Sequence, residues 1–247
     1  MPVFFLPADL IAPPIVTITG DLLTHVRNSL RMTVGEILLL GDGQRRRYRA
    51  EITTVTKQAV TAHIIETLIE PPRTAPALAL GQALLKGDKM DWIIQKTTEL
   101  GVRTIVPVLS RHGIVQPKHD RIESQTARWQ RIALEAAQQS EQWHVASVAV
   151  PQQMSAYLAQ IPRSSTRLIL AERRETSASL RRIDLPASSD DTITLLVGPE
   201  GGWSFDEIAA AENVGWTPIT LGPHILRAET AAVVAIGILQ HRLGALG

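Results

Sequence analysis

The sequence predicts an α/β protein of two domains, a small β-barrel followed by a larger domain built on a parallel sheet. Before residue 71, short segments carry β-branched residues in partial alternation, which is typical of strands. The prolines in Pro71–Pro76 disfavour both a helix and a central strand, so this segment is predicted to be a linker. Beyond it, apolar strand-like runs alternate with helix-like segments, the pattern of a parallel sheet covered on both faces.

The first domain, residues 1–72, is expected to be a barrel of short strands. A strand over Ile37–Leu40 ends at the hairpin-type turn Gly41–Gly43. Further strands are predicted over Arg47–Val55 and Ala59–Ile65. A segment of about seventy residues is just large enough to sustain its own core.

Basic side chains gather in this first domain, and the candidates for nucleic-acid binding are Arg27, Arg31, Arg45, Arg46, Arg47 and Arg49. Arginines around an aromatic residue, here Tyr48, bind phosphates and stack a base. The alternative is a solvated hairpin whose arginines cover only its outer face. The net charge of +1 favours neither interpretation.

The second domain, residues 73–247, begins its alternation at a strand over 78–84. Asp88 is expected to cap a helix that stops at Gly101 and carries Trp92, Ile93, Thr97 and Leu100 on one side. Further strands are expected over 105–109, 145–150, 168–171, 193–197 and 219–221, and further helices over 120–139, 154–161 and 229–243. The last helix is apolar on nearly every face, so we expect it to be buried against its own sheet, a second subunit or both.

Composition excludes several kinds of site. The absence of cysteine excludes disulfides, iron–sulfur clusters and a thiolate nucleophile, and the histidines lack metal-ligand spacing, so no metal is expected. Dinucleotide, P-loop, zinc-protease and nucleophile-elbow motifs are also absent. The N-terminus lacks a secretion signal, and the longest apolar run, Ala231–Leu239, is too short to span a bilayer. We therefore expect a cytoplasmic protein with no membrane contact.

Two glycine-bearing loops near the C-terminus indicate a small-molecule site. The first glycine loop is Gly198–Gly202, and Ser204–Glu207 after it matches a capping box at the start of a helix. The second begins at Leu221 and leads into the last helix. Glycine permits close backbone approach to a ligand, and ligands of open α/β sheets bind where strands end and helices begin.

Three ordered motifs resemble signatures of the RsmE family of SPOUT-class methyltransferases, which methylate N3 of a uridine in 16S ribosomal RNA. They are Lys86–Gly101, Leu196–Gly202 and Leu226–Ala231. The resemblance covers nearly the whole chain. It implies a PUA-like RNA-binding first domain, a second domain with a deep trefoil knot, and a homodimer with the last helix at its interface. The implied substrate is 16S ribosomal RNA in the decoding region of the small subunit, for which the assembled subunit is expected and naked RNA stays open as the alternative.

The resemblance also implies the site. S-adenosyl-L-methionine is expected to contact Leu170, Val197, Gly198, Glu200, Gly201, Gly202, Leu221, Gly222, Ile225, Leu226 and Ala231. Arg227 is the candidate that stabilises the uracil anion, with a salt bridge to Glu229 or to the partner subunit as the alternative. Glu200 is expected to accept the N3 proton or to orient the donor's amino group, with helix capping as its alternative.

The chain departs from the family at two places. Arg111-His112 and Glu141-Gln142 stand where relatives carry other charges, and we expect these changes to affect RNA or subunit contacts and to leave the cofactor loops untouched. Two other functions stay open: a non-catalytic RNA-binding assembly factor, and a SPOUT methyltransferase that acts on another RNA position.

Overall fold

The computed structural model describes residues 3–113, 117, 119–171 and 177–247. Contacts between Cα atoms divide the chain into two units. The first contains Met1–Pro72 and Ala137–Val145, and the second contains Arg73–Ala136 and Ala146–Gly247. The proline-rich segment after residue 70 contains neither helix nor strand.

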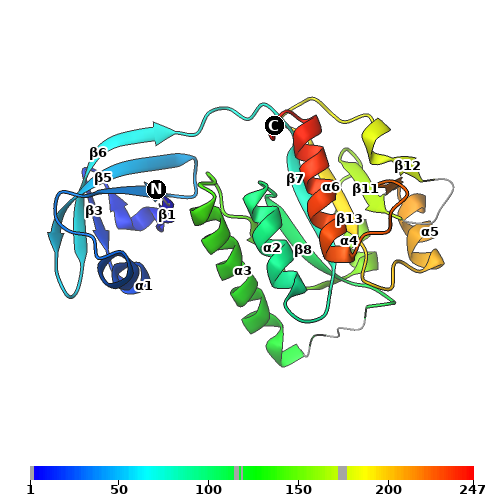
Figure 1. The fold of residues 1–247 in the computed structure, drawn as a ribbon, viewed down its shortest axis with the longest axis horizontal. Helices are drawn as coiled ribbons and strands as arrows, with labels where there is room; N and C mark the ends of the chain where they lie inside the picture. The colour runs from blue at the N-terminus through cyan, green and yellow to red at the C-terminus, as the bar shows by residue number, and fades with distance from the viewer. Residues whose placement is uncertain (1–2, 114–116, 118, 172–176) are drawn as a thin grey trace. The chain divides into compact units, whose positions relative to one another are not determined.

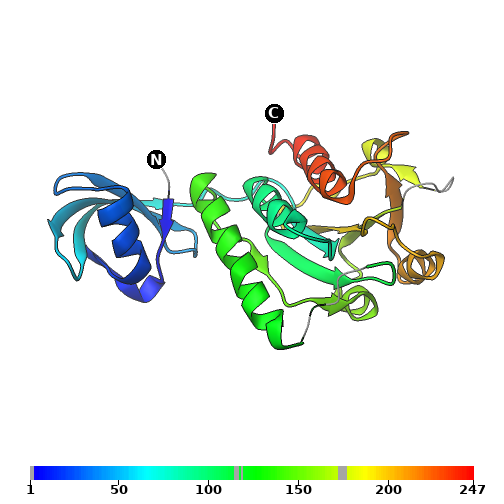
Figure 2. The same cartoon turned by 60° about the horizontal axis from the view of Figure 1, so that its bottom comes forward.

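The first unit is built on a six-stranded sheet in the order β1-β4-β5-β6-β3-β2 (Figure 1). Its strands are β1 (Val3–Phe5), β2 (Ile11–Ala12), β3 (Ile15–Ile18), β4 (Ile37–Gly41), β5 (Arg46–Val55) and β6 (Val60–Ile69). A 3-10 turn (Ala8–Leu10), α1 (Gly20–Thr24) and a π-helical turn (His25–Ser29) complete it. Side chains alternate along β5, so that Ala50 and Ile52 enter a core with Leu38 and Leu40 of β4. The predicted β-structure is confirmed, and Figure 2 shows the sheet strongly curved.

The second unit contains an eight-stranded sheet, and all of its pairings are parallel, as predicted. The order is β10-β8-β7-β13-β11-β14-β12, with β9 beside β8. These strands are β7 (Ala77–Ala83), β8 (Thr104–Leu109), β9 (Ser147–Val148), β10 (Gln152–Gln153), β11 (Thr166–Leu170), β12 (Ala178–Ser179), β13 (Thr192–Val197) and β14 (Thr217–Thr220). Only Ser147–Val148 forms a strand where a longer one over 145–150 is predicted.

Helices lie on both faces of this sheet (Figures 1 and 2). The helices are α2 (Lys89–Glu99), α3 (Ile122–Gln139), α4 (Met154–Gln160), α5 (Phe205–Asn213) and α6 (Ala228–Arg242), with 3-10 turns at His119–Arg121 and Leu180–Arg182. α2 packs beside α6, and α4 packs beside α5. No helix in the described part of the chain is long and apolar enough to cross a membrane.

Two details of the helices differ from the sequence-based expectation. Asp88 takes the N-cap position of α2, but its side chain makes no capping hydrogen bond. Trp92 is 41% exposed, because α2 turns Met90, Ile93 and Ile94 into the core instead. The helix ends before Gly101, which has a φ of +81°, as predicted.

The last helix, α6, is covered on one side by its own chain, which agrees with the expected burial against its own sheet and leaves burial against a second subunit a prediction. Its buried positions are Ala228, Ala231, Ala232, Ala235, Ile236 and Leu239. Val234 is 37% exposed, and Val233 and Ile238 are half-buried. The buried side therefore combines small alanines with Ile236 and Leu239, whereas Val233, Val234 and Ile238 are left at least partly uncovered.

Candidate functional site

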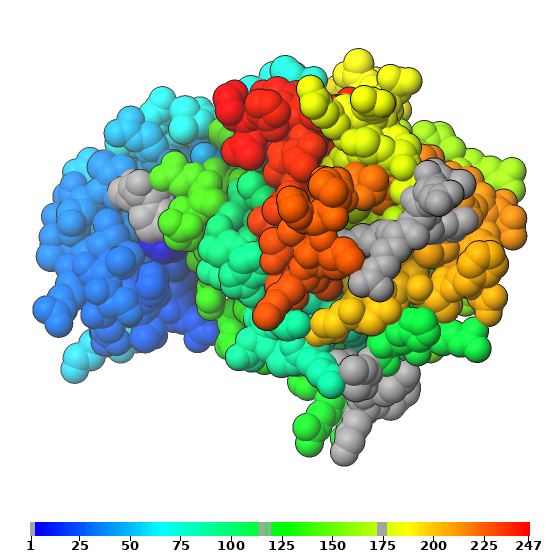
Figure 3. Space-filling view, turned by 45° about the vertical axis from the view of Figure 1, so that its right-hand side comes forward, coloured from blue at the N-terminus to red at the C-terminus, as the bar shows by residue number. Residues whose placement is uncertain are grey.

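The carboxyl ends of β13 and β14 lie at the same edge of the sheet, because both strands run parallel to β11 between them. The first glycine loop, Gly198–Gly202, follows β13, and the second glycine loop, residues 221–227, follows β14. Figure 3 shows the second glycine loop in orange on the same face as the gold segment after β13. A cavity of about 640 Å³ is lined by both loops. Its size and its position outside parallel strands are typical of a small-molecule site.

Most of the predicted cofactor-binding residues meet in this cavity. They are Leu170, Val197, Gly198, Glu200, Gly201, Gly202, Ile225, Leu226 and Ala231, and Arg227 joins them. Leu221 and Gly222 do not line it. The Gly222 N–H instead donates to the Thr220 hydroxyl at 3.3 Å.

The cavity also contains residues that sequence reasoning did not assign, namely Lys89, Ala171, Pro199, Trp203, Ile208 and Ala228. Lys89, Pro199 and Ala228 lie inside the resemblance motifs, so the motifs carried a signal for them. Ile208 comes from α5, which packs beside β14. Among the described residues, no group of His, Asp and Glu side chains is placed to hold a metal ion.

Local sequence dictates the shape of the first glycine loop. A β-carbon on Gly198 would lie 3.1 Å from Nε1 of Trp203, so a larger residue does not fit without movement of the indole. Gly202 has a φ of +70°, a conformation that favours glycine. The predicted capping box is present, because the Ser204 hydroxyl accepts from the Glu207 N–H and the Glu207 carboxylate accepts from the Ser204 N–H. The loop is therefore held between a strand end and a capped helix.

The departure at Arg111-His112 contacts this loop, contrary to expectation. A β-carbon on Gly201 would lie 3.3 Å from Cβ of His112. The Arg111 N–H donates to Glu207 at 2.7 Å, and its guanidinium forms an ion pair with Asp206 at 2.8 Å. This pair of residues therefore packs against the first glycine loop and the first turn of α5.

Lys89 connects two carboxylates at the cavity. Its Nζ lies 2.9 Å from Oε1 of Glu200 and 3.4 Å from Oε2 of Glu229. Burial alone would raise the pKa of Glu200, but the hydrogen bond and the charge of Lys89 outweigh it and lower that pKa. The same hydrogen bond raises the pKa of Lys89. Both groups are therefore charged at neutral pH, and Glu200 is a weak proton acceptor. The capping alternative for Glu200 does not hold, because Ser204 and Glu207 cap α5.

Arg227 occupies the N-cap position of α6 and is exposed at the cavity. Its guanidinium has no ion-pair partner among the described residues. Glu229, the alternative partner considered from sequence, pairs with Lys89 instead. The Arg227 charge is therefore available to a ligand.

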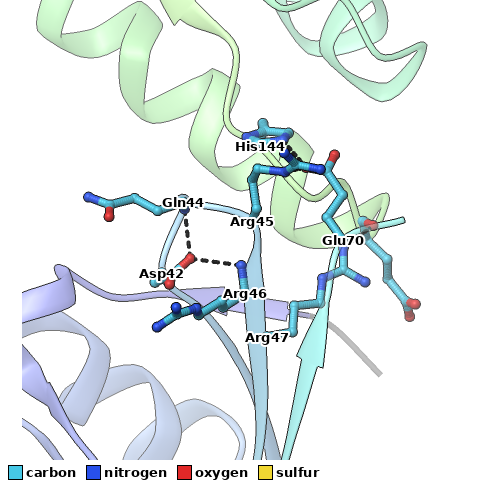
Figure 4. A network of polar contacts seen from close by, with 8 residues as sticks. Asp42, Gln44, Arg45, Arg46, Arg47, Glu70 and His144 are labelled. Carbon is cyan, nitrogen blue, oxygen red and sulfur yellow. Dashed lines mark hydrogen bonds and ion pairs between the residues drawn. The ribbon is translucent and has the colours of Figure 1, made fainter. Parts of the chain in front are cut away.

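The arginines of the first unit lie in different environments, and Figure 4 shows three of them, Arg45, Arg46 and Arg47. Arg47 is only 9% exposed, stacks 4.0 Å from the centre of the Trp143 ring, and donates to the Glu141 carbonyl. Burial lowers its pKa. Its buried position fits a structural role and does not fit the RNA contact that the sequence suggests.

The other arginines of the cluster remain near the surface. Arg45 pairs at 3.2 Å with Glu70, which also contacts His144 at 2.7 Å, and Arg49 pairs with Glu66 at 3.0 Å. Arg27 is half-buried, and its side chain bonds to Asn28 and Thr56. Arg31 and Arg46 are exposed, and neither side chain forms an ion pair within the described residues. These last two are the candidates best placed to meet an RNA phosphate.

Two family models match the chain. Residues 73–240 match the RNA methyltransferase domain, and residues 18–65 match the RNA methyltransferase PUA domain. The ribosomal RNA small subunit methyltransferase E of Synechocystis sp. is 34% identical over 225 residues, which cover 90% of this chain and 71% of the relative. The enzyme of the same name from Bacillus subtilis is 27% identical, over 93% of this chain and 91% of the relative.

Solved structures agree with these matches. A ribosomal RNA small subunit methyltransferase E from Neisseria gonorrhoeae, bound to S-adenosyl methionine, is similar with a TM-score of 0.88 and 33% identity, covering 98% of both chains. A putative methyltransferase from Legionella pneumophila, in complex with the same cofactor, gives a TM-score of 0.85 and 28% identity over 97% of both chains. With its parallel sheet, its PUA domain and its matched methyltransferase domain, the chain belongs to the ribosomal RNA small subunit methyltransferase E family.

Proposed function

We propose that this protein transfers the methyl group of S-adenosyl-L-methionine to N3 of a uridine in 16S ribosomal RNA. Family membership supports the donor and the kind of RNA. The observation that carries the chemistry is Arg227, an exposed guanidinium that no described residue pairs with, at a cavity lined by two glycine-bearing loops.

The residues at the cavity fit the donor. Gly198–Gly202 and residues 225–228 line the cavity, and its volume of about 640 Å³ is in the usual range for a small ligand. When bound, S-adenosyl-L-methionine supplies an electrophilic methyl group together with its own leaving group. The protein then has to position two reactants and stabilise the charge that develops.

We assign that stabilisation to Arg227. Uridine N3 bears a weakly acidic proton that must leave before the nitrogen attacks, and the resulting negative charge spreads onto O2 and O4. A guanidinium remains charged at any working pH, so it favours the anion. The lowered pKa of Glu200 makes it a poor acceptor for the N3 proton, so we assign Glu200 to orienting the donor. The proton then passes to solvent.

We further propose a homodimer that contacts through α6, a deep trefoil knot in the second domain, and the assembled small subunit in the cytoplasm as the substrate. The apolar stripe that α6 leaves uncovered, with Val234 37% exposed, supports the dimer. We retain 1–72 and 73–247 as the functional domains.

Two measurements test the function. Calorimetry with S-adenosyl-L-methionine should show binding, which an RNA-binding assembly factor without catalytic activity has no need of. Nucleosides from small subunits treated with the protein and the donor should then contain 3-methyluridine by mass spectrometry. A ribose-methylated or guanine-methylated product would assign another RNA target, and absence of donor binding would favour the assembly factor. Ribosomal RNA from a strain lacking this gene should lack the same nucleoside.

A further inference from the structure

Lys89 stands at an electrostatically unfavourable place in its own helix. It is the first residue of α2, where unpaired N–H groups give the helix a partial positive charge that disfavours a lysine. Two carboxylates from outside the helix offset this, since Nζ lies 2.9 Å from Glu200 and 3.4 Å from Glu229. The ion pairs with Glu200 and Glu229 therefore explain why a lysine is stable at the start of this helix.

The two carboxylates come from the two sides of the cavity. Glu200 lies in the middle of the first glycine loop, and Glu229 lies in the first turn of α6, two residues after Arg227. Lys89 itself lines the cavity. One ammonium group thus connects three elements that are distant in sequence, and the connection runs along the wall of the site.

Without Lys89, the site would hold two carboxylates with no cation between them. Oε2 of Glu229 is buried and has no hydrogen-bond partner in the part of the chain that the structure describes, so the ion pair with Lys89 at 3.4 Å is the contact there that compensates its burial. Repulsion between Glu200 and Glu229 would then push the first glycine loop away from the start of α6. Glycine-rich loops resist such a force poorly, because their backbone is permissive.

We infer that Lys89 is a positioning residue that holds the first glycine loop and the start of α6 at the separation required for the methyl donor and for Arg227. This inference rests on the proposed function. Its physical basis is preorganisation, because loops that are fixed before binding lose less entropy when the ligand arrives. Lys89 touches neither reactant in this scheme and acts through Glu200 and Glu229.

The test compares Lys89→Met with Lys96→Met. Lys96 lies on the same helix, is exposed to a similar degree, and pairs with Glu99 at 2.8 Å away from the cavity. Lys89→Met should weaken donor binding on the order of tenfold, because it removes two partly exposed ion pairs and leaves a carboxylate uncompensated. Hydrogen exchange of residues 198–202 should accelerate in the ligand-free variant, and Lys89→Arg should restore most of the affinity. Lys96→Met should change none of these.

Single-turnover rates at saturating donor and RNA provide a second readout. These rates should fall in Lys89→Met, because Arg227 is then misplaced even with the donor bound. If the substitution only destabilised the ligand-free protein, saturating donor and RNA would restore the wild-type rate. Glu229→Gln should reproduce part of the effect. Wild-type affinity, exchange and rate in Lys89→Met would overturn the inference while leaving the function intact. Absence of donor binding to the wild-type protein would overturn the function itself and this inference with it.

Discussion

The indole of Trp203 occupies the space that a side chain on Gly198 would need. An ideal β-carbon on Gly198 lies 3.1 Å from Nε1, 3.2 Å from Cε2 and 3.3 Å from Cδ1 of that ring. All three atoms belong to its five-membered part. A glycine that follows a buried strand is thus matched to an aromatic residue five positions later, and together they shape the wall of the cavity.

Gly198→Ala should therefore displace Trp203 and deform the first glycine loop. Overpacking of this kind costs about 1–3 kcal/mol, and donor affinity should fall about tenfold, since 1.4 kcal/mol corresponds to a factor of ten. Calorimetry and thermal unfolding measure the two effects. Adding Trp203→Phe, which lacks the five-membered ring, should recover much of the affinity. Equal affinities in the wild type and Gly198→Ala would show that the loop tolerates a side chain.

Arg227→Ala should lower the single-turnover rate of methyl transfer by about 10²–10³, the usual effect of removing one charge-stabilising donor. Donor affinity should change little, because the contact is made mainly in the transition state. Raising the pH should partly rescue the rate, since hydroxide then helps to form the uracil anion. Arg227→Lys should retain only part of the activity. If the alanine variant instead loses donor binding or dimer formation, its role is structural.

Arg31→Ala and Arg46→Ala should weaken RNA binding. The slope of log binding constant against log salt concentration should become shallower by about one unit for each phosphate that the variant no longer neutralises. Binding isotherms at several salt concentrations measure this. Donor affinity serves as the internal control and should not change. An unaltered salt slope would identify these arginines as a solvated face of the first unit.

Arg47→Ala should act on stability rather than on RNA. It removes the stacking on the Trp143 ring and leaves the Glu141 carbonyl without this donor. We expect a loss of about 1–3 kcal/mol in the free energy of unfolding, measured with denaturant. Arg46→Ala, at the neighbouring exposed position, should leave it unchanged. A stable Arg47→Ala protein with a reduced salt slope would restore Arg47 to the RNA-binding set.

Val234→Arg should convert a dimer into a monomer, because it places a charge on the exposed apolar stripe of α6. Sedimentation at micromolar concentration measures the outcome. Val150→Arg, at a position that is 49% exposed outside α6, is the control and should leave the dimer intact. A wild-type protein that sediments as an active monomer would rule out the proposed interface.

Local signals were enough to predict much of this protein. The alternation of strand and helix patterns, the prolines after residue 70 and the Ser204–Glu207 capping box each depend on neighbours in the chain, so they could be recognised without the fold. The position of both glycine loops after strands was also predictable, and a parallel sheet brings such loops to one edge.

Only the tertiary structure decided which charges face each other. Lys89 and Glu200 are 111 residues apart, and no local pattern pairs them. The burial of Arg47 against Trp143 and the contact of His112 with Gly201 likewise arise from segments that meet only after folding. Ion pairs and burial depend on distance in space, whereas sequence patterns report distance along the chain. For that reason the sequence predicted the glycines that shape the two loops, but it did not predict the ion pairs of Lys89 that hold the loops together.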